Sequence, residues 1–447
     1  MHRAASRSQA RRRRRPEPAP DRSRGRQRWP RPLCPSSLLA GSWNLLAIVH
    51  RLRAYCVPGI PPSGRRQPGR SAANVRAEWA TVDLFDRLRA WSLRRQRLDR
   101  SAPDPLSALR DVVGVYSAHP SGPLALHART RGLTAAAFAD LETRRQAIRI
   151  VAMRGSAFLV PADTADLLLA ASWRSLSPSY LAARGLDAPT YARLRPRILS
   201  AILEPLTPTQ LRSALGVARD DQLAYFAMRA MAREGLVIRI GTGQMRTDDL
   251  RWVATEAWLG RPFDDFDPDE ALGWLAGAYL DAFGPARVAD LAWWVGVPRG
   301  RAAMALETVS TVDLGEGLLL PAALADAWAA TEPMDPDAMA VIGKWDPYPM
   351  GYAPDGRRRF LAEAHLGLAY STRETRVGAT SGDAFPLILR GGRAVATWTH
   401  RLTGDRMDVE VRPFPDTSDP HALVEGARPA FDAIGELLEA RVNVVGG

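Results

Sequence analysis

Apolar residues recur at helical spacing through much of the chain from residue 82 onward. This spacing predicts a first helix from residue 82. A second helix is expected to have Pro105 near its start, because proline is favoured in the first helical turn. The next pattern predicts a helix over residues 134–155, and then a short strand over 157–162. The buried stripe of the first helix is predicted to consist of Leu84, Leu88 and Trp91.

The clearest pattern lies between residues 207 and 254. Thr207 is a natural helix N-cap, Pro208 suits the first helical position, and Gly216 then turns the chain into a second helix. Gly235 ends that helix, and residues 236–254 are typical of a β-hairpin with a glycine-containing tip. This order indicates a winged helix-turn-helix domain; the alternative is a small α+β unit with no role in DNA binding. The buried stripe of the second helix is predicted to be Leu223, Phe226, Ala227, Ala230 and Met231.

A second copy of this arrangement follows, and the chain then changes character. Residues 270–322 repeat the order of helices and two short strands, after an acidic connector over 260–271 that suits a linker and helix cap. Residues 384–414 contain three strand-like runs separated by Gly-Gly and Thr-Gly-Asp turns, which indicates an antiparallel meander. An amphipathic helix over 419–442 is expected to close the fold.

These patterns predict an α+β protein. Tandem winged-helix domains, each a helix-turn-helix with a β-hairpin wing, are followed by a C-terminal antiparallel β-rich domain. The expected boundaries are an Arg-rich leader at 1–76, winged-helix domains at 82–195, 196–262 and 268–332, and a C-terminal β-domain with its closing helix at 333–447.

The net charge of +12 is unevenly distributed along the chain. Residues 1–76 contain 18 arginines and only two acidic residues, whereas the remainder is slightly acidic. This leader has too few apolar residues to fold. It has three interpretations: a basic arm that tethers DNA, an export segment, or an upstream stretch outside the working protein, which we favour. Lys344 is the only lysine, so any DNA-binding surface beyond the leader must come from arginines clustered on one face.

The sequence lacks the spacings that metal sites and several other chemistries need. Both cysteines, Cys34 and Cys56, lie in the leader, and the histidines beyond it never stand at an i, i+4 spacing. The glycine-rich run 241–246 lacks the lysine of a phosphate-binding loop. The apolar run 36–50 is too short to span a bilayer. We therefore expect no metal, no cofactor and no membrane attachment.

One stretch between two predicted helices carries candidate chemistry. Residues 111–130 read DVVGVYSAHPSGPLALHART, and the first helix is expected to stop at Gly114. Tyr116, Ser117 and His119 follow before a Pro-Ser-Gly-Pro turn. They form either a catalytic site or simple helix termination, in which Ser117 bonds the backbone and His119 is solvated.

Together with the central winged-helix pattern, three segments resemble a family of winged-helix DNA-binding proteins that includes the AlkZ- and YcaQ-type DNA glycosylases. The segments are 112–129, 343–352 (GKWDPYPMGY) and 390–414, and the resemblance extends over roughly residues 82–444. It implies tandem winged helices with a C-terminal β-rich domain. The family's characterised enzymes excise bulky N-alkylated purines, including interstrand crosslinks, so repair or self-resistance is implied.

The resemblance gives the 111–130 stretch a chemical role. An N-alkylated purine is already cationic, so the enzyme mainly has to position a water at the sugar and stabilise positive charge there. In the family a Gln-x-Gln or Gln-x-Asp element holds that water, whereas this chain has Tyr116, Ser117 and Ala118 at the corresponding positions. Tyr116 can orient a water and His119 can act as a base. The chain is thus expected to be either a monofunctional glycosylase with a divergent motif or a noncatalytic DNA-binding protein, such as a lesion sensor or transcriptional regulator.

Duplex DNA is the expected partner, and the protein is expected to be a monomer of the cytoplasm, associated with the nucleoid. Arginine contacts to phosphates would make the binding salt-sensitive; the alternative is a solvated charged face. The expected DNA-binding residues are Gln222, Tyr225, Arg229, Arg233, Arg239, Arg246 and Arg401. The residues expected either to line the same cleft or to be core and turn residues are Asp346, Tyr348, Trp398 and His400.

Overall fold

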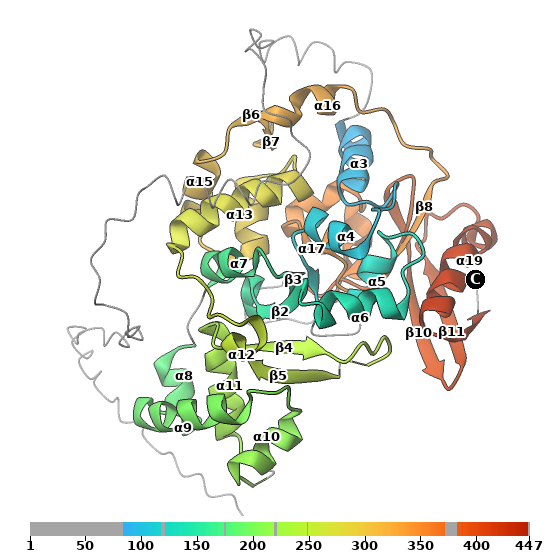
Figure 1. Ribbon diagram of the computed structural model, residues 1–447. Helices are drawn as coiled ribbons and strands as arrows, with labels where there is room; N and C mark the ends of the chain where they lie inside the picture. The colour runs from blue at the N-terminus through green and yellow to red at the C-terminus, as the bar shows by residue number, and fades with distance from the viewer. Residues whose placement is uncertain are drawn as a thin grey trace, which may run out of the picture. The chain divides into compact units, whose positions relative to one another are not determined.

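A computed structural model gives the fold of the chain (Figure 1). It describes residues 84–117, 121–173, 176–218, 221–247, 249–371 and 382–445. All of them belong to the larger of the two units into which the chain divides, residues 61–447. Within the described ranges, no helix has the length and hydropathy needed to cross a membrane.

The first sheet is antiparallel and five-stranded, in the order β1-β3-β2-β4-β5. Arg149 on β2 pairs with Arg239 on β4, so the hairpins of the first two expected domains form one continuous sheet. Residues 147–151 are strand rather than the expected helix. The preceding helix ends before Arg145, whose φ of 58° is left-handed, and the next residues bury apolar side chains on both faces of the sheet. The strands are β1 (Val115–Tyr116), β2 (Ala147–Val151), β3 (Ala157–Pro161), β4 (Val237–Gly241) and β5 (Leu250–Ala254).

Helices near the first three strands share a core with the C-terminal part of the chain. Leu109, Leu126 and Phe138 are buried in the same apolar cluster as Ile388 and Trp398. The first expected domain is therefore not packed as an independent unit. Its helices are α4 (Pro105–Asp111), α5 (Ser121–His127), α6 (Ala135–Thr143) and α7 (Ala165–Ser172), and η1 (Met153–Gly155) is the turn between β2 and β3.

A second group of helices lies beside the β4–β5 hairpin (Figure 1). The expected cap is confirmed: Thr207 and Gln210 form a capping box, and Gly216 ends the helix in the left-handed conformation. The expected boundary at 195–196 falls inside a helix, because Tyr191 and Ile198 belong to this core. The helices are α8 (Pro178–Ala182), α9 (Ala188–Ala201), α10 (Pro208–Leu215), α11 (Leu223–Arg233) and α12 (Thr255–Leu259).

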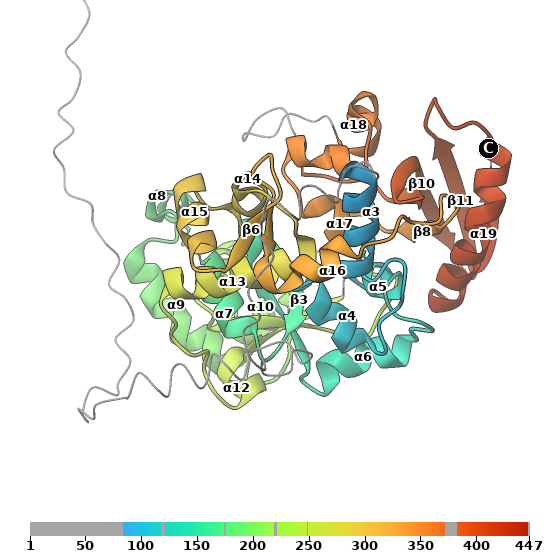
Figure 2. The ribbon, with the colours of Figure 1, turned by 90° about the horizontal axis from the view of Figure 1, so that it is seen from above.

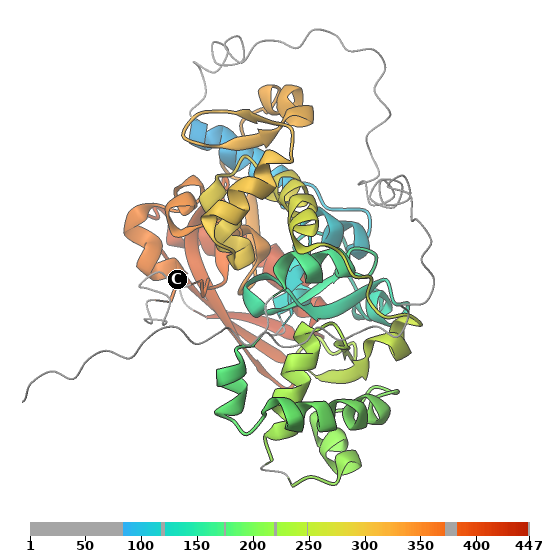
Figure 3. The same ribbon diagram turned by 90° about the vertical axis from the view of Figure 1, so that its left-hand side faces the viewer.

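The third group contains the second small hairpin and, unexpectedly, the first described helix. Leu88 and Trp91 of α3 (Leu84–Arg95) pack against Leu320 and Trp328 of this group. The backbone of α3 is seen beside the small hairpin in Figure 3. Although α3 precedes residues 100–195 in the sequence, its apolar side chains pack with this third group, so α3 is not part of the first expected domain. The other elements are α13 (Pro268–Phe283), α14 (Val288–Leu291), η2 (Ala292–Gly296), α15 (Arg299–Glu307), β6 (Thr311–Asp313), β7 (Leu319–Pro321), η3 (Ala322–Leu324) and α16 (Ala325–Ala329).

The C-terminal sheet has the order β12-β11-β10-β9-β8. The expected meander and closing helix are present, and α19 lies alongside the sheet (Figure 2). Two edge strands were not expected, and one of them, β12, runs parallel to β11. The elements are β8 (Met339–Ile342), α17 (Pro347–Met350), η4 (Pro354–Arg359), η5 (Glu363–His365), α18 (Leu366–Ala369), β9 (Leu387–Arg390), β10 (Arg393–Thr403), β11 (Arg406–Pro413), α19 (Pro420–Leu437) and β12 (Arg441–Val445).

Candidate functional site around Tyr116

Tyr116 ends the short edge strand β1 and is half-buried. Val113, just before Gly114, has a φ of 66°. This left-handed value is rare for a β-branched residue, so the backbone that leads into β1 is strained. The amide of Ser117 donates to the carbonyl of Ala157 at 2.9 Å. Its buried hydroxyl has no hydrogen-bond partner within the described ranges. Ala118 and the expected base, His119, lie outside the described residues.

Aromatic rings enclose Tyr116. Its ring meets Trp345 edge to face at 4.7 Å between centroids, and Phe158 of β3 at 5.7 Å. The indole nitrogen of Trp345 donates to Asp383 at 2.6 Å, and Lys344 lies 4.4 Å from the Trp345 ring and 3.4 Å from the same carboxylate. Trp345 itself has a φ of 56°, a second strained residue beside Tyr116.

A buried ion pair fixes the loop that carries Trp345. Asp346 accepts two hydrogen bonds of 2.7 Å from Arg129 and a third from the amide of Tyr348, and all its side-chain area is buried. Asp346 was expected either to line the cleft or to be a core or turn residue. It holds the loop from inside the core and caps α17.

Arg154 lies near Tyr116, and Arg357 lies near Arg154. Arg154 in the η1 turn lies 5.2 Å from the ring of Trp293, and Arg357 lies 5.6 Å from the same ring. Arg357 also stacks at 3.6 Å on Tyr370. Burial and the neighbouring Arg357 lower the pKa of Arg154 to about 10, while nearby Tyr116 and Tyr370 act in the opposite direction. The protein therefore keeps two cations close together in a poorly hydrated place.

A polar network supports the sheet beneath Tyr116. Glu142 binds Arg149 through two hydrogen bonds, of 3.0 and 2.9 Å, and both side chains are buried. The Glu142 carboxylate also accepts from the amide of Gly241 at 2.8 Å, and Arg149 reaches the carbonyl of Ser117 at 3.5 Å. The second hairpin is thereby tied to the strand end at Tyr116.

Three of the expected DNA-binding residues share one face of α11. Gln222 and Tyr225 are exposed, and Arg229 donates to the Tyr225 hydroxyl at 3.3 Å. Arg184 extends the face: its guanidinium lies 3.6 Å from the Tyr180 ring, which in turn contacts Phe226. One exposed ring, Tyr225, thus lies with two half-buried rings and two cations, a combination that suits contact with nucleic acid.

The other three expected arginines of this region bind protein groups. Arg233 donates to the carbonyl of Gly155 at 3.5 Å, and Arg239 lies 4.8 Å over Trp252. Arg246, at the tip of the β4–β5 hairpin, donates to the carbonyls of Leu438, Gly404 and Glu439. Its donors are directed to backbone oxygens of the C-terminal part rather than to solvent.

The remaining expected residues divide between core and surface. Tyr348 and Trp398 are fully buried, and the Trp398 indole donates to the carbonyl of Ile342 at 2.9 Å, so they are core residues, one of the two expected placements. His400 and Arg401 are exposed on β10. No group of three His, Cys, Asp or Glu side chains suited to a metal ion occurs within the described residues.

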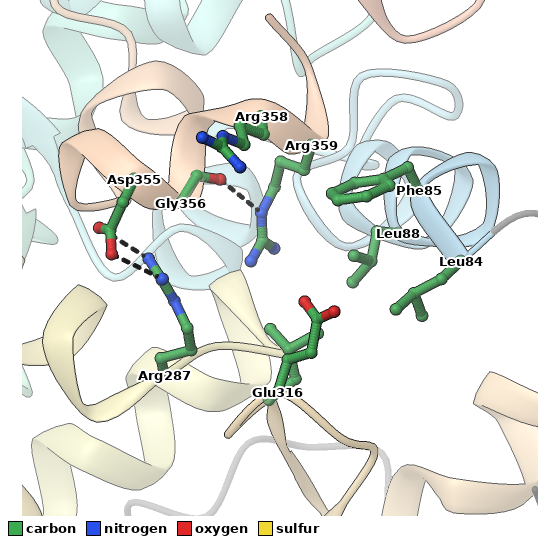
Figure 4. Close-up of a pocket in the computed structure, with 10 residues that line it drawn as sticks. Leu84, Phe85, Leu88, Arg287, Glu316, Asp355, Gly356, Arg358 and Arg359 are labelled. Atoms are coloured by element: carbon green, nitrogen blue, oxygen red, sulfur yellow. Dashed lines mark hydrogen bonds and ion pairs between the residues drawn. The ribbon is translucent and has the colours of Figure 1, made fainter. Parts of the chain in front are cut away.

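A cavity of about 280 Å³ lies apart from these residues, between α3, η4 and the β6–β7 turn. Figure 4 shows Arg287 and Asp355 facing each other through two hydrogen bonds of 2.8 and 2.9 Å. Arg359 points into the cavity, with Glu316 on the opposite wall (Figure 4). Charges of both signs and leucine side chains line it, and none of the expected site residues does.

Sequence reasoning missed most of the surroundings of Tyr116. They come from the η1 turn, from η2 and from loops near η4 and β9, where no periodicity marks a functional residue. The segment GKWDPYPMGY, which carries part of the family resemblance, is the one signal in the sequence, since its Trp345 contacts Tyr116. The missed residues are Arg154, Trp293, Trp345, Arg357, Tyr370 and Asp383.

Two comparisons with known proteins give a match. The family model described as "DNA glycosylase AlkZ-like" matches residues 109–441, which include Tyr116, Arg154, Trp345 and Arg357. The chain belongs to the AlkZ-like DNA glycosylase family. A solved structure, the DNA glycosylase AlkZ of Streptomyces sahachiroi, superposes with a TM-score of 0.64 at 20% sequence identity. The match covers 81% of this chain and 99% of that one, and it shows a shared fold. Curated protein sequences give no match.

Proposed function

We propose that this protein binds duplex DNA and hydrolyses the N-glycosidic bond of a bulky N-alkylated purine held at Tyr116. The observation that carries the proposal is the placement of Tyr116. Within the region matched by the family model, it ends a strand beside the rings of Phe158 and Trp345 and near the cationic Arg154. Repair of alkylation damage, or self-resistance to an alkylating agent, is the corresponding role.

The order of the elements supports a winged-helix mode of DNA binding. Helices followed by an antiparallel hairpin occur at α10, α11 and β4–β5, and again at α14, α15 and β6–β7. In this proposal Gln222, Tyr225 and Arg229 on the exposed face of α11 contact the duplex. Their side chains supply base-edge and phosphate contacts.

The leaving group does not need to be protonated. A cationic alkylpurine departs as a neutral base, a water adds its hydroxyl group to the sugar carbon, and one proton is released. The Tyr116 hydroxyl orients the water, and His119 accepts the proton. Aromatic walls at Phe158 and Trp345 bind the flat purine and exclude bulk solvent.

The test is excision from a duplex that carries one N7-alkylguanine, with abasic sites measured against spontaneous depurination. The wild-type chain is expected to release the base. Tyr116→Phe removes only the hydroxyl and should lower the rate by about 10²-fold, the usual order for a positioned proton-transfer group. Tyr191→Phe removes a tyrosine hydroxyl in the separate core around α9 and α11, so it is the matched control. Binding without excision by the wild-type chain would contradict the enzymatic part of the proposal.

A second candidate, lesion binding without catalysis, is favoured by one specific observation. Tyr116 and Ala118 stand where the family has its glutamine-containing pair, and Ala118 has no group that can hold a water. The double variant Tyr116→Gln with Ala118→Gln separates the two candidates. Excision gained by the double variant, with none in the parent, would identify the parent as a DNA-binding protein only.

A further inference from the structure

Lys344 is the only lysine among the 60 lysines and arginines of the chain, and it lies at the candidate site. Its Nζ atom is 4.4 Å from the centroid of the Trp345 ring, and the centroid of the Tyr116 ring is 4.7 Å from that of the same indole. One indole therefore contacts both the amine and the tyrosine. The Lys344 side chain is 30% exposed, so it is open to solvent.

A lysine at this position can do chemistry that an arginine cannot. Once it has lost a proton, a lysine amine adds to an aldehyde and forms an imine, whereas a guanidinium group keeps its proton at neutral pH. Either side chain can form an ion pair or contact a phosphate, and the rest of the chain has arginine for such contacts. The sugar that remains after base excision opens to an aldehyde at C1′. The one amine side chain of the protein thus lies where an aldehyde would form.

The backbone on both sides of Lys344 is fixed. Gly343, which precedes it, packs on α5 so closely that a Cβ atom there would lie 3.1 Å from the Leu124 side chain. Asp346, two residues after Lys344, is held by its buried ion pair with Arg129. A short anchored segment therefore carries the amine, and this limits the entropy that is lost when the amine meets the sugar.

A carboxylate stands next to the amine. Asp383 lies 3.4 Å from the Lys344 Nζ atom and accepts a hydrogen bond of 2.6 Å from the indole nitrogen of Trp345. The ion pair positions the amine beside the indole, and the carboxylate is within reach of the protons that imine chemistry has to move. A nucleophile, a proton acceptor and an aromatic wall of the candidate site are thus in contact.

We propose that Lys344 attacks C1′ of the abasic sugar once the base has left the site at Tyr116, and that the protein then cleaves the DNA strand on the 3′ side of that sugar by β-elimination. The inference goes beyond the proposed function and rests on it, because excision supplies the abasic sugar. It gives the protein a second activity, in contrast to the monofunctional enzyme expected from the sequence.

The steps need only water and these two side chains. The Lys344 ammonium passes a proton to Asp383, which releases it to solvent, and the neutral amine adds to the C1′ aldehyde; loss of one water gives a protonated imine. Asp383 then removes a hydrogen from C2′. The electron pair left at C2′ forms a double bond to C3′, and the C3′–O bond breaks with the 3′ phosphate as the leaving group. Water hydrolyses the imine, which frees the amine and leaves an unsaturated aldehyde on the 5′ fragment.

Reductive trapping tests the inference. The full-length chain is incubated with sodium borohydride and a duplex that carries one pre-formed abasic site, because borohydride reduces an imine to a stable amine link between protein and DNA. The wild-type chain is expected to form a covalent adduct that peptide mass spectrometry maps to Lys344. Without borohydride, it should cleave the strand about 10²-fold faster than the abasic site breaks unaided, the usual order for a positioned proton-transfer group.

Two variants isolate the amine of Lys344. Lys344→Arg keeps the positive charge beside Asp383 but cannot form an imine, so it should lose both the adduct and the strand cleavage. The matched control adds Arg428→Lys to this variant, which returns one lysine to the chain in an ion pair with Glu425 on α19, and it should stay inactive in both assays. Melting curves establish that the variants fold. If Lys344→Arg does not fold, the mapped position of the wild-type adduct still decides the question.

The outcomes separate this inference from the function on which it rests. An adduct that persists in Lys344→Arg, that maps to the amino terminus or that Arg428→Lys restores would overturn the inference, and an adduct without strand cleavage would overturn the elimination step. If the wild-type chain excises N7-alkylguanine but forms no adduct, the inference is wrong and the proposed function stands. If it forms the adduct at Lys344 but excises no base, the amine chemistry stands and the proposed excision is wrong. Absence of both activities removes both.

Discussion

Arg129 and Asp346 lie 217 positions apart in the sequence and form a fully buried ion pair with two hydrogen bonds of 2.7 Å each. The pair joins the end of α5 to the loop after β8. Arg129 also donates to the carbonyl of Ala125, and Asp346 accepts from the amide of Tyr348. Because Trp345 precedes Asp346, this pair fixes the ring that contacts Tyr116.

We expect Asp346→Asn to lower the free energy of unfolding by about 3–5 kcal/mol, because it leaves the Arg129 charge buried without its partner. Chemical denaturation followed by circular dichroism measures the change. Asp337→Asn is the control: it breaks the exposed pair with Arg390 and should cost no more than about 1 kcal/mol. Equal, small effects of both substitutions would mean that the buried pair does not hold the loop.

Arg246→Met is expected to destabilise the protein without changing the salt dependence of DNA binding. Arg246 donates to the carbonyls of Leu438, Gly404 and Glu439, so its loss leaves backbone oxygens at the end of α19 without these donors. The expected cost is about 2 kcal/mol, typical of hydrogen bonds from a charged group. A changed salt dependence with unchanged stability would instead place this side chain on DNA.

Arg229→Gln is expected to change the salt dependence of DNA binding without destabilising the protein. Arg229 lies on the face of α11 with Gln222 and Tyr225, and its guanidinium group contacts the exposed Tyr225. Its removal should reduce the slope of log affinity against log salt by about 1 and change the melting temperature little. The measurement is affinity for duplex DNA at several salt concentrations. Loss of stability without loss of DNA affinity would contradict an interface on this face.

Stability is expected to fall in mildly acidic solution partly through His127. Burial lowers the pKa of His127 below its usual value, although Glu436 opposes the shift. The folded state thus favours the neutral ring. The contribution of His127 is fully present above its unfolded-state pKa, about 6.5, and is lost as the pH falls from there through the lower folded-state pKa. Melting temperatures at pH 7.5 and 5.5 measure the effect.

The substitution His127→Gln should make the loss of melting temperature between these two pH values smaller. The same change at His421, an exposed residue at the start of α19, is the control for losing a histidine. An identical pH dependence in wild type and His127→Gln would show that another group is responsible.

Local sequence alone determined the elements whose signals are contained within a few residues. The capping box at Thr207 and the left-handed Gly216 follow from hydrogen bonding within one turn or two. Helical spacing correctly placed Ala227, Ala230 and Met231 of α11 in the core, whereas Leu223 and Phe226 are only half-buried. The meander around β10 was equally predictable, since its turns carry glycine and its strands alternate. Tyr116 could be singled out because it interrupts an apolar pattern before a proline turn.

Only the tertiary structure decided which elements pack together and what surrounds Tyr116. Residues 147–151 became a strand because pairing with β3 and β4 outweighs their helical pattern, and α3 joined distant residues because Trp91 packs on Trp328. No sequence signal distinguishes Arg246 from Arg229. The Arg246 side chain nevertheless donates to backbone carbonyls, whereas Arg229 lies on the exposed face of α11. Burial, long-range pairing and the repulsion of like charges arise between residues far apart in the chain, so no local pattern encodes them.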